Sequence, residues 1–96
     1  MYTCSVVSES FRIFPKNKKN ETIVIPVVRT VFTLRHRSGE EITFRRSFHR
    51  GQWKWSDSRI KGTVSQEYVV EEMARMMFRG NVNKAIDLVI ANLMAA

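Results

Sequence analysis

Arginines recur at alternate positions in the middle of the chain, where the sequence predicts a β-hairpin. Residues directly opposite one another in a hairpin lie on the same face of a sheet. One face would therefore gather Arg29, Arg35, Arg37, Arg45 and His49, interleaved with Thr33, Thr43 and Ser47. Guanidinium groups and hydroxyls bind phosphate oxygens. Only Glu41 is acidic here, whereas a solvated face usually mixes both signs. The pattern favours a phosphate-binding face, and an ordinary solvent-exposed sheet face is the alternative.

The apolar residues of this hairpin predict its pairing. Leu34 and Phe44 can stand side by side only if the loop between the strands has an odd number of residues, three or five, such as residues 38–40. A two-residue turn would set each apolar face against a polar one. Arg46 does not fit this arrangement, because it falls on the apolar side of its strand. We expect Arg46 at the sheet edge, or turned outward by a bulge.

Further cations lie in flanking segments. Residues 15–21 contain no apolar side chain after the proline and predict an exposed basic loop. Beside a basic sheet, such cations would extend an electrostatic footprint along a nucleic-acid backbone. The alternative is that they only keep the surface soluble. The cations in question are Lys16, Lys18 and Lys19 in the loop, and Arg50, Lys54, Arg59 and Lys61 after the hairpin.

Two tryptophans follow the hairpin. Trp53 and Trp55 are two residues apart, so in a strand both indoles point to the same side. Large aromatic side chains are mostly buried, which favours packing in the core or at its edge. If exposed, the indoles would instead form a platform that stacks on nucleobases, or an anchor for a protein partner.

The excess positive charge is confined to the first two thirds of the chain. The 96 residues include 16 Lys or Arg and 9 Asp or Glu, a net charge of +7. Residues 1–62 hold 13 basic and 5 acidic side chains and carry +8, whereas residues 63–96 hold 3 basic and 4 acidic ones and carry −1. With 44% hydrophobic residues, the chain has enough apolar side chains for the core of one domain, residues 1–96.

The basic segment reads as strands, because β-branched and aromatic residues alternate with polar ones and turn residues separate the runs. We expect a bulge or turn at residues 8–10, between runs at 2–6 and 11–13. Pro26 interrupts the next strand and predicts an edge or a bulge at that point.

The last third has a helical period. Apolar residues recur at helical spacing over 69–79 and again over 82–93. Thr63 or Ser65 can start the first helix, Gly80 can end it, and Asn81 can cap the second. The predicted fold is α+β: an antiparallel meander of three to five strands, followed by a helical hairpin that packs on one face of the sheet.

Several functional classes find little support in the sequence. Cys4 is the only cysteine, so no internal disulfide can form, and with His36 and His49 it makes no zinc-ligand set. No apolar run approaches the ~20 residues of a membrane-spanning helix. The first residues do not resemble a signal peptide, which favours a cytoplasmic location. Phosphate loops and nucleophile elbows are missing, so we expect no enzyme, no cofactor and no metal.

Two functional hypotheses remain. The first is a non-enzymatic module that binds DNA or RNA phosphates through the arginine-rich face and the basic loop. The second is a modulator whose basic face docks on an acidic patch of a larger protein, such as a nucleic-acid-processing host enzyme. In size, basic charge and strand-then-helix order, the chain resembles the small accessory proteins of bacteriophages, many of which bind a host enzyme or nucleic acid. This resemblance implies no role for any particular residue.

Overall fold

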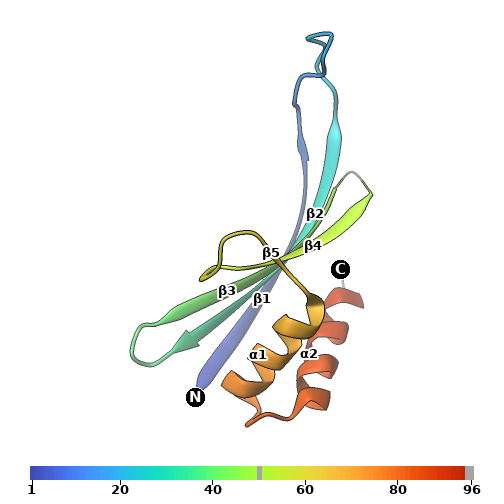
Figure 1. The fold of residues 1–96 in the computed structure, drawn as a ribbon. Coiled ribbons are helices and arrows are strands. Elements are labelled where there is room, and N and C mark those ends of the chain that lie inside the picture. Colours follow the sequence, from blue (N-terminus) through green and yellow to red (C-terminus); the bar gives the residue numbers. More distant parts are fainter. Residues whose placement is uncertain (50, 95–96) are drawn as a thin grey trace.

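Alternation in the first two thirds and helical spacing in the last third produce a sheet and a helix pair. The computed structural model describes residues 1–49 and 51–94. Five antiparallel strands lie in the order β1-β2-β3-β4-β5, and two helices pack against the sheet (Figure 1). The elements are β1 (Tyr2–Ile13), β2 (Ile25–His36), β3 (Glu41–His49), β4 (Gln52–Asp57), β5 (Thr63–Val64), α1 (Gln66–Met77) and α2 (Val82–Met94). The α+β prediction, a meander followed by a helical hairpin, is confirmed.

β1 is a single uninterrupted strand. It pairs with β2 in one register from Tyr2, opposite His36, to Ile13, opposite Ile25. The bulge or turn predicted at residues 8–10 is therefore wrong. Ser8 and Ser10 point to the same side of β1 as the half-buried Tyr2 and Cys4, but both serines are exposed. The change from apolar residues to serine therefore marks where the side chains of β1 cease to be buried, while its pairing with β2 continues.

The β1–β2 ladder continues beyond the strands. The backbone N–H of Ile23 donates to the carbonyl of Pro15 at 2.9 Å, and Lys16 bridges to Thr22 in the same register. At the tip, the side-chain oxygen of Asn17 accepts hydrogen bonds from the backbone N–H groups of Lys19 and Glu21. This Asx turn fixes the end of the hairpin. The exposed loop predicted for residues 15–21 is thus the ordered end of a long β-ribbon.

The ribbon projects from the rest of the molecule, and we call residues 11–27 the β-arm. Among the described residues, β2 pairs with β3 only as far as Val28, opposite Phe48, so the β-arm has two strands and no further neighbour in that part of the sheet (Figure 1). Pro26 lies past that last pair, which confirms its predicted edge position. The principal extents are 52 × 27 × 20 Å. The radius of gyration is 15.4 Å, against about 12.5 Å for a compact chain of this length.

The β2–β3 hairpin has the predicted odd loop but a different pairing. Phe32 stands opposite Phe44, and Leu34 stands opposite Ile42. The expected pairing of Leu34 with Phe44 is therefore wrong by two residues along β3. The loop is residues 37–39, closed by the N–H of His36, which donates to the carbonyl of Glu40. Gly39 has φ +99° at the last loop position. A three-residue hairpin loop needs a left-handed residue there, and that requirement decides the register.

The helices cover one face of the sheet. Ser65 caps α1 by accepting a hydrogen bond from the N–H of Tyr68, and Asn81 accepts one from Lys84 at the start of α2. The N–H of Gly80 closes α1 by donating to the carbonyl of Ala74. The shared core contains Phe32, Leu34, Ile42, Phe44, Trp55, Val69, Val70, Met73, Ala74, Met76, Ala85 and Val89.

A buried carboxylate joins the β4–β5 loop to α1. Asp57 is 1% exposed and accepts two side-chain hydrogen bonds from Arg59, at 2.8 and 3.1 Å. It also accepts one from the hydroxyl of Tyr68 at 2.8 Å, and Arg59 donates onward to Glu72. Burial by itself would raise the pKa of Asp57, but the hydrogen bonds from Arg59 and Tyr68 outweigh it, and the pKa lies below its ordinary value.

Candidate nucleic-acid interface

The arginines predicted to share a face do so. Arg29, Arg35 and Arg45 alternate on β2 and β3 on the side away from the helices, and Lys54 of β4 stands opposite Ser47 on the same side. We call this side the open face. Arg37 lies just beyond β2, in the hairpin loop. Two further predicted site groups, Arg50 and the side chain of His49, lie outside the part of the chain that the structure describes.

Two of these arginines are neutralised by neighbouring glutamates. Arg29 stands opposite Glu9 of β1 and forms an ion pair with it, and its guanidinium lies 5.0 Å from the ring centroid of Phe11. Arg35 donates to Glu41, directly opposite, at 2.8 Å. The open face is therefore less one-sided in charge than its sequence suggested. Arg37, Arg45 and Lys54 are exposed and form no ion pair within the described residues.

The β-arm carries a second group of positive charges. Its four cations are Arg12, Lys16, Lys18 and Lys19, and its single carboxylate is Glu21, so its net charge is +3. All four cations are exposed and form no ion pair within the described residues. Arg12 was not among the site residues predicted from the sequence. The signal that could have found it is the apolar alternation on both sides of residues 15–21, which extends the hairpin.

The two tryptophans point to the same side, as predicted, but differ in burial. Trp55 is 5% exposed, donates a hydrogen bond to Gln66 at 3.3 Å and lies 5.8 Å from the ring of Phe32. Trp53 is 47% exposed. Core packing is confirmed for Trp55, whereas Trp53 is exposed and contacts Phe48 and Arg46. Trp55 packs in the core and bonds Gln66 of α1, whereas Trp53 lies beyond the pairing of β5, where β4 is the sheet edge.

Arg46 lies neither at an edge nor at a bulge, which corrects the prediction. It pairs regularly with Thr30 of β2 and Trp55 of β4, and its side chain is on the helix side of the sheet. Its guanidinium carbon lies 3.6 Å from the ring centroid of Trp53. Burial lowers the pKa of this guanidinium. Stacking on the indole is what accommodates a cation on this side of the sheet.

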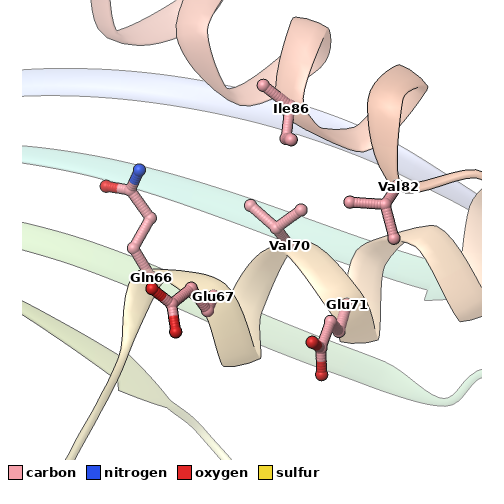
Figure 2. A pocket seen from close by; sticks show the side chains of 6 residues that line it. All are labelled: Gln66, Glu67, Val70, Glu71, Val82 and Ile86. Atoms are coloured by element: carbon pink, nitrogen blue, oxygen red, sulfur yellow. The ribbon is translucent and has the colours of Figure 1, made fainter.

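A groove between the two helices offers different chemistry. Val70 of α1 faces Val82 and Ile86 of α2, with Glu67 and Glu71 at the rim (Figure 2). The groove has a volume of about 230 Å³. Because its charged groups are carboxylates, it does not suit phosphate.

Within residues 1–49 and 51–94, no three His, Cys, Asp or Glu side chains are grouped so that they could hold a metal ion. Over the same residues, no helix has the length and apolar character needed to cross a membrane. Comparison of the chain with protein-family models, curated proteins and solved structures finds no match.

Proposed function

We propose that this protein is a non-enzymatic nucleic-acid-binding module that contacts phosphates through its β-arm. The observation that supports this most is the charge of the β-arm: four exposed cations and one carboxylate on a ribbon that stands clear of the body. Lysine and arginine side chains that neutralise phosphates bind DNA and RNA without reading their sequence. Arg37, Arg45 and Lys54 on and beside the open face would extend the same footprint.

The shape of the β-arm also suits nucleic acid. A two-stranded β-ribbon is one of the elements that the major groove of DNA admits. The Asx turn at Asn17 holds the tip in one conformation, so less entropy is lost when Lys18 and Lys19 meet phosphates.

An acidic protein partner is the second candidate, and a specific observation favours it. Phe14 and Val24 stand opposite each other in the continued register and are 62% and 56% exposed, between the cations Arg12 and Lys16. Apolar side chains ringed by cations can anchor a protein interface. A pull-down from nuclease-treated lysate separates the candidates: a stoichiometric protein that survives the nuclease supports this second function, and capture that disappears with the nucleic acid counts against it.

Neutralising the tip of the β-arm is expected to weaken nucleic-acid binding. The triple variant Lys16→Gln, Lys18→Gln, Lys19→Gln should bind labelled single-stranded and duplex oligonucleotides at least about tenfold more weakly at low salt, because three phosphate contacts are lost. Fluorescence anisotropy measures the effect.

The matched control removes the same charge elsewhere. Lys61→Gln, Arg79→Gln, Lys84→Gln changes three exposed cations outside the β-arm and the open face. Its affinity for the oligonucleotides should fall by less than about threefold, because these charges lie far from the proposed phosphate contacts and are screened by salt. Equal losses of affinity in the two triple variants would contradict a specific role for the β-arm. Wild-type protein that binds neither DNA nor RNA at low salt would contradict the proposed function itself.

A further inference from the structure

A row of side chains crosses four strands where the β-arm leaves the body. Ser10, Val28, Phe48 and Trp53 stand opposite one another in turn on β1, β2, β3 and β4. The row lies on the helix side of the sheet, yet Val28 is 36% exposed and Trp53 is 47% exposed. An open hollow of about 390 Å³ lies at the β1 end, lined by Ser8, Glu9, Ser10 and Val28. The row is therefore an accessible strip with an aromatic end at Trp53.

The indole of Trp53 is braced from one neighbouring strand only. Phe48 lies 4.6 Å away between ring centroids, with the rings tilted by 37°, and the Arg46 guanidinium lies 3.6 Å from the indole centroid. Both supports come from β3. On its other side β4 is unpaired at Trp53, because β5 ends its pairing at Trp55. Nearly half of the indole surface therefore stays open although its orientation is held by two contacts.

Arg46 is costly for the fold by itself. Its Nε atom is buried and has no hydrogen-bond partner among the described residues, and the side chain forms no ion pair within that set. A buried donor without a partner destabilises a protein, and an apolar residue of similar length would avoid the penalty. What Arg46 supplies instead is a positive charge stacked on an exposed aromatic ring.

We infer that Trp53 is a stacking site for an unpaired nucleobase, with Arg46 and Phe48 as positioning residues that contact the indole. The inference rests on the proposed function and deepens it, because it names unpaired bases as the preferred ligand. Bases stack on exposed aromatic side chains whatever their identity, and arginine adds a cation–π contribution. Arg12 follows Ser10 on the same side of β1, at the opposite end of the row from Trp53, so a strand that lies along the row would reach a cation of the β-arm.

Removing the indole tests the site directly. Trp53→Ala should weaken binding of a single-stranded oligonucleotide by about tenfold, within the range measured for one stacked base. Trp53→Phe should recover most of that loss, and duplex binding should change by less than about twofold, because paired bases cannot reach the ring. Ile90→Ala, which truncates an α2 side chain of similar exposure at 45%, serves as control and should leave both affinities unchanged.

Fluorescence separates stacking from a general loss of binding. In the Trp55→Phe background, emission reports Trp53 alone, and both a mononucleotide and a single strand should quench it if the site takes a free base. Quenching by the strand alone still supports stacking and assigns the site to nucleic acid. If the Trp55→Phe variant does not fold, the anisotropy series in the wild-type background provides the test.

Arg46→Met gives a signature that a purely structural arginine would not show. We expect Tm unchanged or higher, because the unpartnered buried donor is removed, together with single-strand affinity about threefold lower, because the cation that contacts the ring is lost. A lower Tm with unchanged affinity would overturn the positioning role.

The failures of the two proposals are distinguishable. If the β-arm triple variant loses binding while Trp53→Ala binds single strands like wild type, the stacking site is wrong and the proposed function stands. If the wild-type protein binds no nucleic acid at low salt, both are wrong. Loss of a nuclease-resistant protein partner on Trp53→Ala, with nucleic-acid affinity unchanged, would assign the indole to a protein interface instead.

Discussion

Phe32→Ala is expected to destabilise the protein by about 3–5 kcal/mol, because it empties the centre of the core. Phe32 is fully buried, lies opposite Phe44 and packs near Trp55. Small domains have total stabilities of roughly 5–15 kcal/mol, so the variant should be close to unfolding at ambient temperature. Denaturant unfolding followed by circular dichroism measures the change.

Phe14→Ala is the matched control for that substitution. It removes the same side-chain atoms from a residue that is 62% exposed on the β-arm. The loss should stay within about 0.5 kcal/mol, because little apolar surface returns to water. Equal losses at the two positions would mean that the helices do not cover the sheet as described.

Asp57→Asn is expected to cost about 2–4 kcal/mol, since hydrogen bonds to a charged acceptor are stronger than those to a neutral one. The carboxylate is buried and holds Arg59 and Tyr68, and Arg59 in turn reaches Glu72 of α1. The substitution therefore weakens the link between the β4–β5 loop and the helices. For a chain of this length, Tm should fall by roughly 4–8 °C for each kcal/mol lost.

The same carboxylate predicts a dependence on pH. Because folding lowers the pKa of Asp57, its stabilisation is complete above the unfolded-state pKa of about 4 and is lost as the pH falls through the folded value. The wild type should lose stability in acid, and its advantage over Asp57→Asn should shrink there. Asp87→Asn, at an exposed position of α2, should track the wild type at every pH. A constant gap between Asp57→Asn and the wild type from neutral to acid pH would contradict the network.

Alternation and helical spacing predicted the layers of this fold because both report which side of an element is buried. The apolar side of β2 and β3 is the side that the helices cover, and Ser65 and Asn81 cap the helices as expected. The predicted partner of Leu34 was wrong by two residues, because the apolar pattern determines only which face of the sheet a residue takes. The left-handed Gly39 selects among registers that satisfy the pattern equally.

The candidate site was harder to predict, because it depends on which strands become neighbours. Glu9 precedes the β-arm in the sequence and Arg29 follows it, so nothing local to either residue indicates their ion pair. Trp53 and Trp55 point to the same side of β4, but Trp55 packs in the core and bonds Gln66 of α1, whereas Trp53 is exposed. Arg46 looked like an interruption of an apolar face. Its place follows only from the contact with Trp53.

Together, the β-arm and the row that ends at Trp53 would form a surface suited to single-stranded nucleic acid. The β-arm supplies exposed cations that would follow the backbone, and the strip at its base would take an unpaired base. The two parts act through different physics, since charge contacts weaken with salt whereas stacking does so far less. This difference gives each part its own experimental signature.

The salt dependence of single-strand binding tests the central claim most directly. The logarithm of the binding constant should fall linearly with the logarithm of salt concentration, with a slope near −0.7 for each phosphate neutralised. The variant Lys16→Gln, Lys18→Gln, Lys19→Gln should flatten that slope by about 2, because three phosphate contacts are removed. An unchanged slope in this variant, or a wild-type affinity that does not respond to salt, would contradict binding through the β-arm.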